Sequence, residues 1–171
     1  MPSAKQGTFV YRALSLDDAR AIASWRYPAP YDCYDCPPWA QMVEQDWALC
    51  DPDRRAAQFV GLFDPADQAG PIGFYRLRAF PEEARTILGC GLRPDSCGHG
   101  IGVTLVQRAV DDATTRWPGS PVELEVRPFN DRAIRLYTNL GFRMEPRTSS
   151  EPGGEPLLRM RYMPRLPREE V

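Results

Sequence analysis

The stretch Cys97-Gly98-His99-Gly100-Ile101-Gly102, with glycine at every second position, constrains the fold of this chain more than any other. It follows a strand-like segment that ends near Leu92 and precedes a long amphipathic helix that starts near Gly100. Glycine has no Cβ, so the backbone here can turn tightly and approach a ligand closely. A helix that begins at such a loop directs its unpaired N–H groups and the positive end of its dipole toward it. The stretch therefore predicts either an anion site, suited to phosphate or pyrophosphate, or only a tight turn from strand to helix.

The segment after this glycine loop predicts a helix with one apolar face. The apolar positions recur at helical spacing: Leu105, Val106, Ala109, Val110 and Ala113. Trp117-Pro118-Gly119 ends the helix, and the alternation over Val122–Val126 predicts a strand with one buried face. A shorter helix is predicted after an N-cap at Asn130 or Asp131, with Gly141 at its left-handed C-terminal end.

The remaining elements are predicted from β-formers, caps and turn residues. The expected strands cover residues 9–14, 57–63, 72–80, 85–92, 142–148 and 157–163, and the expected helices run from a Ser15 cap to about Trp25 and from Trp39 to Leu49. An aromatic, proline-rich loop over residues 27–38 separates these two helices. The predicted order is β-α-α-β-β-β-α-β-α-β-β.

Length and charge restrict the class of protein. A chain of 171 residues predicts a single domain over residues 1–171, with a loose tail from about residue 164. The formal net charge of −2 argues against binding to nucleic acid, which needs a basic surface. Because neither a membrane-spanning apolar run nor a signal-peptide core is recognisable, we expect a cytoplasmic protein that does not bind membranes.

The glycine loop can be compared with two nucleotide-binding patterns. It lacks the Gly-Lys-Ser/Thr ending of a Walker A loop, which argues against nucleotide hydrolysis. A dinucleotide fingerprint would need a third glycine where Val103 stands, although an acidic residue, Glu125, does lie downstream. The strands over residues 57–63 and 72–80 are predicted to form an antiparallel hairpin, which argues against a doubly wound fold. The hypothesis of dinucleotide binding is therefore weakened and not excluded.

Two segments are similar to motifs of one family. Residues 92–102 resemble motif A of the GNAT acyltransferases, which ends in Gln/Arg-x-x-Gly-x-Gly/Ala, with Gly100 and Gly102 at the two small positions. Residues 129–142 resemble motif B of the same family. Together with the predicted order of elements, the resemblance covers nearly the whole chain. It implies an α/β domain with a mixed, mostly antiparallel sheet of about six or seven strands flanked by helices.

The resemblance also implies a reaction, in which an acetyl group moves from acetyl-coenzyme A to a primary amine by direct attack. The coenzyme-binding residues that it implies are Leu92, Cys97, Gly98, His99, Gly100, Ile101, Gly102 and Asn130. The strand ending near Leu92 would diverge from the one starting at Val122 and leave room for the pantetheine arm. Cys97 departs from the family pattern, which most often has Arg or Gln there, so pyrophosphate would be held mainly by backbone N–H groups.

Tyr137 matches the family's general acid, which protonates the departing thiolate, whereas helical spacing alone would make it a core aromatic. The attacking ammonium must lose a proton, and Glu83, next to Glu82 before the fourth strand, lies where the family often supplies the base. Asp32 and Asp35 in the aromatic loop are alternatives. Each of these carboxylates is also explained as a solvated surface charge. His99, the only histidine, is interpreted as a side chain near the coenzyme.

The five cysteines are expected to be free thiols. Cys33 and Cys36 form a C-x-x-C pair, but zinc would need a second pair, and a redox pair should open a helix where two prolines follow instead. No metal site is therefore predicted. The aromatic residues of this region are interpreted as a wall of the acceptor pocket or as packing on the sheet: Tyr27, Tyr31, Tyr34 and Trp39.

The sequence leaves the acceptor open between a small-molecule amine and a protein amine, either an N-terminus or a lysine side chain. It also leaves the oligomeric state open, a homodimer included. The main alternative function is a non-catalytic sensor that binds acyl-coenzyme A and regulates a partner. A third hypothesis is a domain that binds a nicotinamide dinucleotide.

Overall fold

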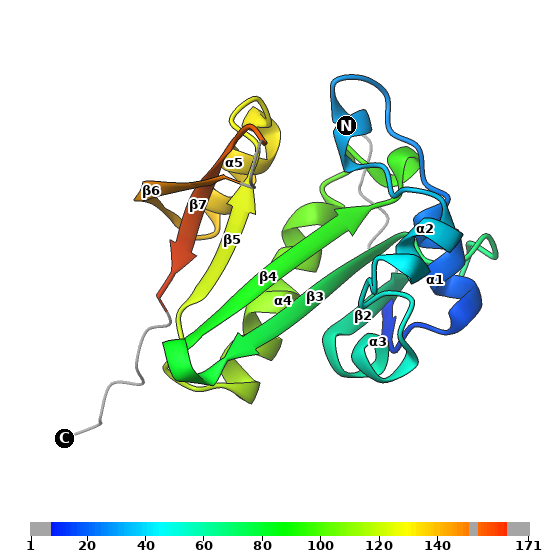
Figure 1. Ribbon diagram of the computed structural model, residues 1–171, viewed down its shortest axis with the longest axis horizontal. Coiled ribbons are helices and arrows are strands. Elements are labelled where there is room, and N and C mark those ends of the chain that lie inside the picture. Colours follow the sequence, from blue (N-terminus) through cyan, green and yellow to red (C-terminus); the bar gives the residue numbers. More distant parts are fainter. Residues whose placement is uncertain (1–7, 151–153, 164–171) are drawn as a thin grey trace. The chain divides into compact units, whose positions relative to one another are not determined.

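A computed structural model of the chain describes residues 8–150 and 154–163 (Figure 1). The tail predicted from about residue 164 lies outside the described residues. The strands are β1 (Val10–Arg12), β2 (Phe59–Phe63), β3 (Gly73–Phe80), β4 (Arg85–Leu92), β5 (Val122–Val126), β6 (Arg143–Ser150) and β7 (Pro156–Tyr162). The α-helices are α1 (Leu16–Ala23), α2 (Trp39–Glu44), α3 (Pro52–Gln58), α4 (Ile101–Arg116) and α5 (Asp131–Asn139). Short 3-10 helices cover Tyr31–Tyr34 (η1), Pro81–Glu83 (η2) and Pro94–Ser96 (η3).

The described strands form a seven-stranded sheet in the order β1-β2-β3-β4-β5-β7-β6. β1 pairs antiparallel with β2, and β7 pairs antiparallel with both β5 and β6. β4 and β5 are parallel, and α4 makes the crossover that a parallel pair requires. The predicted mixed, mostly antiparallel sheet flanked by helices is confirmed. Its order was not predicted, because β7 inserts between β5 and β6.

The fold divides into two compact units. One comprises Met1–Tyr75 and Cys90–Ile101, and the other comprises Arg76–Gly89 and Gly102–Val171. The boundary passes through β3, β4 and the first residue of α4. The single domain expected for residues 1–171 stays a prediction.

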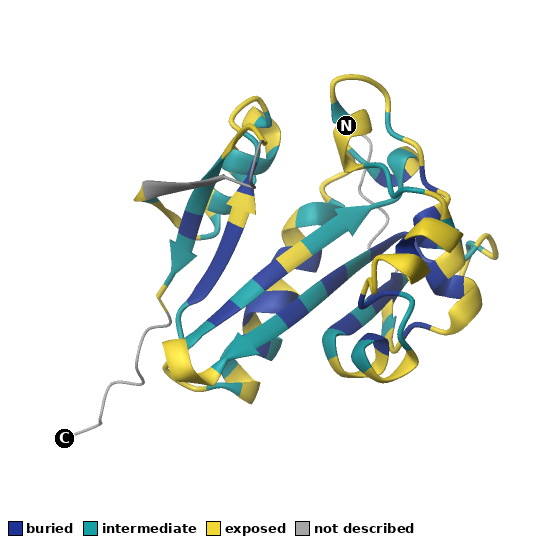
Figure 2. Cartoon of the chain, in the orientation of Figure 1, coloured by how far each residue is buried: buried dark blue, intermediate teal, exposed yellow. Residues whose placement is uncertain are grey.

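The core of the unit that contains β5 is built on the apolar face of α4. The five residues predicted for that face are the buried residues of the helix. Buried apolar side chains from the strands of the same unit are Leu77, Leu88, Val122, Leu124, Val126 and Met160. Figure 2 shows buried positions along these strands. β5 pairs with β7 along its whole length, from Val122 with Tyr162 to Val126 with Leu158. Its pairing with β4, by contrast, joins only Thr86 to Val122 and Ile87 to Glu123, both strands being wholly described.

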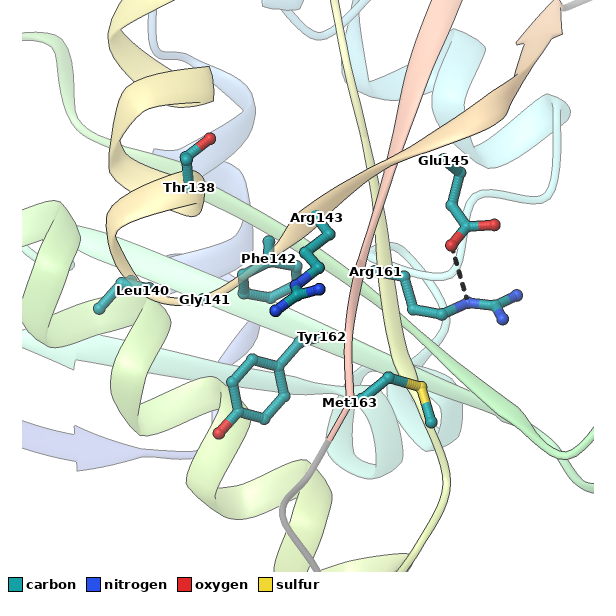
Figure 3. A pocket seen from close by; sticks show the side chains of 9 residues that line it. All are labelled: Thr138, Leu140, Gly141, Phe142, Arg143, Glu145, Arg161, Tyr162 and Met163. Atoms are coloured by element: carbon teal, nitrogen blue, oxygen red, sulfur yellow. Dashed lines mark ion pairs between the residues drawn. The ribbon is translucent and has the colours of Figure 1, made fainter.

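The C-terminal end of α5 packs through aromatic rings. The centroid of the Phe142 ring lies 5.8 Å from that of Tyr137 and 5.5 Å from that of Tyr162. Figure 3 shows the Phe142 and Tyr162 side chains. Gly141, which follows the C-cap Leu140, has φ +99°, so the predicted left-handed end of this helix is confirmed. A Cβ at Gly141 would lie 3.5 Å from the Tyr162 ring, which is ordinary contact. Glycine is therefore required by the backbone conformation and not by crowding.

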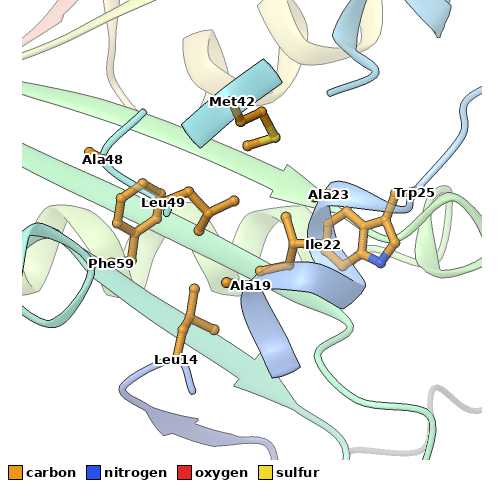
Figure 4. Close-up of a cluster of buried hydrophobic side chains, with 9 residues drawn as sticks. All are labelled: Leu14, Ala19, Ile22, Ala23, Trp25, Met42, Ala48, Leu49 and Phe59. Atoms are coloured by element: carbon orange, nitrogen blue, oxygen red, sulfur yellow. The ribbon is translucent and has the colours of Figure 1, made fainter. Parts of the chain in front are cut away.

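The other unit has its own hydrophobic core, contributed by α1, α2, β2 and the loops that adjoin them (Figure 4). Its buried members are Leu14, Ala19, Ile22, Ala23, Trp25, Met42, Ala48, Leu49 and Phe59. The predicted Ser15 cap of α1 is confirmed as a capping box with Asp18. The Ser15 hydroxyl accepts the Asp18 N–H at 3.1 Å, and the Asp18 carboxylate accepts the Ser15 N–H at 2.8 Å.

α3 was not predicted from the sequence. Asp51 and Pro52, which follow the helix predicted from Trp39 to Leu49 and are typical of its end, begin a new helix instead. The Asp51 carboxylate accepts the N–H of Arg54 at 2.7 Å, and Pro52 occupies a first-turn position, where its missing N–H costs little. The predicted strand from Ala57 consequently starts only at Phe59, and α2 is shorter than the helix predicted from Trp39 to Leu49.

Candidate functional site

The glycine loop connects β4 to α4 as predicted. Gly98 has φ +81° and Gly100 has φ +79°, in the left-handed region that residues with a Cβ rarely adopt. A Cβ added to either glycine would meet nothing within 4 Å, so the backbone conformation, not packing, requires glycine there. Gly98, His99 and Gly100 are all exposed, so their backbone N–H groups are open to a ligand.

The first turn of α4 adds further donors to this loop. The helix has 16 residues from Ile101 to Arg116, and the N–H groups of its first turn have no partner within the helix. The helix dipole places positive partial charge at the same end. The loop and the helix start together provide backbone donors and a favourable field for an anion, which is the chemistry of a phosphate site.

Cys97 is turned toward the backbone that precedes it. Its Sγ lies 3.5 Å from the carbonyl oxygen of Arg93 and 3.9 Å from that of Leu92, so the thiol donates within the turn. The residue that departs from the family pattern therefore stabilises the loop's own conformation.

Arg93 anchors the chain where it leaves β4. Its guanidinium donates through Nε to Asp95 at 2.6 Å and through Nη2 to Asp67. These hydrogen bonds from Arg93 hold the pKa of both carboxyls below their usual range. The exit from β4 is thus tied to the turn that carries Asp67, between β2 and β3.

Tyr27 contacts the same place from the aromatic loop. Its hydroxyl donates to the carbonyl oxygen of Leu92 at 2.7 Å. From the sequence, Tyr27 was expected only in a wall of the acceptor pocket or in packing on the sheet. Because 65 positions separate the two residues, no local sequence signal could have revealed their contact.

The predicted residues of α5 lie in the other unit. The side-chain oxygen of Asn130 accepts the N–H of Ala133 at 3.2 Å, so Asn130 is the helix cap, one of the two alternatives proposed for it. Tyr137 is half-buried, and its ring packs against Phe142. The coenzyme contact of Asn130 and the acid role of Tyr137 stay predictions.

Glu83, the predicted base, lies in η2 between β3 and β4. Its carboxylate is exposed and accepts from Nε of Arg85 at 2.6 Å. Glu82 beside it is exposed as well. The Glu83 carboxylate is therefore engaged in an ion pair at the start of β4.

A buried, ion-paired carboxylate on β5 was not predicted. The predicted alternation placed Glu123 on the solvent-exposed face of β5. The residue is only 2% exposed, so the prediction of a single buried face is wrong at this position. Nε of Arg161 lies 3.0 Å from its carboxylate and Nη1 of Arg85 lies 3.3 Å from it. Arg161 also faces Glu145 at 3.6 Å (Figure 3). Burial is possible because charged partners on β4 and β7 replace the water that the carboxylate loses.

A pocket of about 770 Å³ opens at the C-terminal end of α5 (Figure 3). It is lined by Thr138, Leu140, Gly141, Phe142, Arg143, Glu145, Arg161, Tyr162 and Met163. None of the residues assigned to coenzyme binding or catalysis lines it.

Within residues 8–150 and 154–163, His, Cys, Asp and Glu side chains form no group of three or more that could hold a metal ion. Cys33 and Cys36 are free thiols, and Cys33 is exposed. Over the same residues, every helix is too short or too polar to cross a membrane.

Comparison with known proteins decides the family. The profile of the acetyltransferase (GNAT) family matches residues 18–142. The chain belongs to the GNAT acetyltransferase family. The match includes the glycine loop and the α5 segment, the two motifs from which the resemblance was inferred, and the acyltransferase class predicted from them is that of the GNAT family.

A relative of this GNAT protein matches only part of the chain. The N-alpha-acetyltransferase RimI of Mycobacterium tuberculosis is 34% identical over 84 residues, which are 49% of this chain and 51% of that protein. The match thus spans about half the length of this curated relative.

Two solved GNAT structures illustrate the shared fold. A phosphinothricin acetyltransferase from Sinorhizobium meliloti in complex with AcCoA is 19% identical, with a TM-score of 0.66 over 91% of this chain and 88% of that one. The ribosomal-protein-S18-alanine N-acetyltransferase from Escherichia coli is 20% identical, with a TM-score of 0.63 over 96% and 99%. At these identities the likeness establishes the fold.

Proposed function

We propose that this GNAT protein is an N-acetyltransferase that transfers the acetyl group of acetyl-coenzyme A to a primary amine. The observation that carries the proposal is the exposed loop before α4, in which left-handed Gly98 and Gly100 leave backbone N–H groups accessible at a helix N-terminus. A related fold that contains AcCoA supports the choice of coenzyme. The backbone from Cys97 to Gly102 would bind the pyrophosphate, with Leu92 and Asn130 as further contacts.

The coenzyme would supply an acetyl group activated as a thioester, and the residues of the chain would move the protons. Glu83 would accept a proton from the acceptor ammonium, leaving a neutral amine to attack the acetyl carbonyl. Tyr137 would donate its hydroxyl proton to the coenzyme sulfur as the C–S bond breaks, and the second proton that the amine nitrogen loses as the amide forms would return the tyrosine to its neutral form. The assignment of Tyr137 has the support of the family match across α5. The assignment of Glu83 as the base has less support, because its carboxylate already accepts a hydrogen bond from Arg85.

For the acceptor, we propose the N-terminal amine of a protein. The relative with 34% identity is named as an N-alpha-acetyltransferase, whereas spermidine N-acetyltransferases share the fold at 22% identity or less. A net charge of −2 gives no separate support to either acceptor class.

Turnover of acetyl-coenzyme A with a panel of peptides and polyamines tests the proposal. We expect Tyr137→Phe to lower kcat by about 10²–10⁴-fold, the usual contribution of a general acid, with coenzyme binding retained. Tyr162→Phe is the matched control, because Tyr162 is the other tyrosine whose ring packs on Phe142.

Three outcomes would contradict parts of this proposal. Unchanged activity in Tyr137→Phe would exclude the assigned acid. Coenzyme binding without acetylation of any amine would favour the acyl-coenzyme A sensor. A melting temperature that rises with NAD, but not with acetyl-coenzyme A or coenzyme A, would favour dinucleotide binding.

A further inference from the structure

The peptide group between Leu92 and Arg93 is held at both of its polar ends. Its carbonyl oxygen accepts the Tyr27 hydroxyl at 2.7 Å, and its N–H donates to the carbonyl of Ile72 at 2.9 Å. β4 ends at this peptide group. The two hydrogen bonds fix the plane of the peptide, and with it the direction in which the chain leaves the strand.

Tyr27 is itself held in place by the aromatic loop. Its backbone N–H donates to Oδ1 of Asp35 at 2.9 Å, and the Asp35 N–H donates to the carbonyl of Asp32 at 3.1 Å. Burial raises the pKa of Tyr27, so its hydroxyl keeps its proton and can act as the donor at any physiological pH. The contact therefore joins an internally bonded loop, residues 27–38, to the end of β4.

The turn after β4 continues from this fixed peptide into the glycine loop. The N–H of Ser96 donates to the carbonyl of Arg93 at 2.9 Å, and the Cys97 thiol lies 3.5 Å from the same oxygen. Gly98 and Gly100 follow at once in their left-handed conformations. The orientation of the loop's N–H groups thus depends on the peptide that Tyr27 holds.

We propose that Tyr27 is a positioning residue for the acyl coenzyme. Its hydrogen bond to Leu92 fixes the direction in which the chain leaves β4, so that the loop from Cys97 to Ile101 presents its N–H groups to the pyrophosphate. This inference rests on the proposed function. Leu92 is an expected coenzyme contact, and one of its backbone groups, the carbonyl, already accepts a hydrogen bond from Tyr27.

The test is calorimetric binding of coenzyme A to Tyr27→Phe at a temperature where the protein is folded. Loss of one partly buried hydrogen bond should weaken binding by about threefold to tenfold. The KM for acetyl-coenzyme A should rise by a similar factor, with kcat changed by less than about twofold. Tyr11→Phe is the matched control, since it removes a buried tyrosine hydroxyl from β1 in the same unit. Equal coenzyme affinity in Tyr27→Phe and the wild type would overturn the inference.

Hydrogen exchange on the wild-type protein gives a second test that needs no folded variant. If Tyr27 favours the binding conformation, coenzyme binding must favour the Tyr27 hydrogen bond in return. Adding coenzyme A should therefore slow exchange of the Arg93 amide and of amides in residues 27–38. Unchanged exchange there, with coenzyme bound, would refute the positioning role alone. Failure of the wild type to bind coenzyme A would instead refute the proposed function.

Discussion

Replacing Glu123 with glutamine removes the buried charge that joins β4, β5 and β7. The side chain of Glu123 is 3% exposed, whereas those of Arg85 and Arg161 are 22% and 37% exposed. Glutamine keeps the shape of the side chain and one acceptor oxygen, but it leaves both guanidinium groups without their shared counter-charge. The substitution therefore probes electrostatics with little change in packing.

The expected loss in free energy of unfolding is about 2–3 kcal/mol. Removing one partner of a fully buried ion pair costs about 3–5 kcal/mol. Here the cost falls below that range, because each arginine is partly solvated and retains a second carboxylate. Arg85 keeps Glu83 at 2.6 Å, and Arg161 keeps Glu145 at 3.6 Å. For a chain of this size, such a loss corresponds to a fall in Tm of about 5–10 °C.

Urea unfolding followed by circular dichroism measures the effect, and Glu125→Gln is the control. Glu125 is the next acidic residue on β5 and pairs with Arg159 at 3.3 Å, but their side chains are 37% and 30% exposed. Such a surface pair contributes about 0–1 kcal/mol. If Glu123→Gln lost no more stability than Glu125→Gln, the argument that Glu123 is a buried, compensated charge would be wrong.

Two further predictions concern the glycine loop and the cap of α1. Gly100→Ala should cost about 1–2 kcal/mol of stability and weaken coenzyme A binding, because φ +79° is strained for alanine. Gly89→Ala is the control, because φ at Gly89 is not left-handed and a Cβ there meets nothing within 4 Å. It should change neither the stability nor the coenzyme A affinity, and calorimetry measures both quantities. Burial alone would raise the pKa of Asp18, but hydrogen bonds from Arg12 and Ser15 hold that pKa below its ordinary value. The carboxylate therefore stabilises the fold above about pH 4, and this stability is lost as the pH falls further. Asp18→Asn should be less stable than the wild type at pH 7, with the difference shrinking below pH 4 in unfolding titrations; a constant difference would contradict this.

Local features of the fold could be predicted because their causes lie within a few residues. The apolar face of α4 follows from its helical period. The caps at Ser15 and Asn130 follow from side chains that reach only three residues along the chain. The error at Asp51-Pro52 was also local, because the same residues can follow one helix or begin the next.

In the candidate site, the glycine loop could be predicted from the sequence but the general base could not. The glycine loop could be recognised because left-handed backbone favours glycine, which is visible in the sequence. The base was not determined, because a carboxylate on a surface turn looks the same in sequence whether it titrates or pairs with a neighbour such as Arg85.

The sequence by itself determined the family, the elements around the two motifs and the position of the glycine loop before α4. The tertiary structure alone decided which polar groups meet. It buried Glu123 between strands that are far apart in the chain, and it joined the Tyr27 hydroxyl to the Leu92 carbonyl across 65 positions. Such contacts depend on strand order and chain path, which arise from packing of the whole fold and leave no periodic pattern in the sequence.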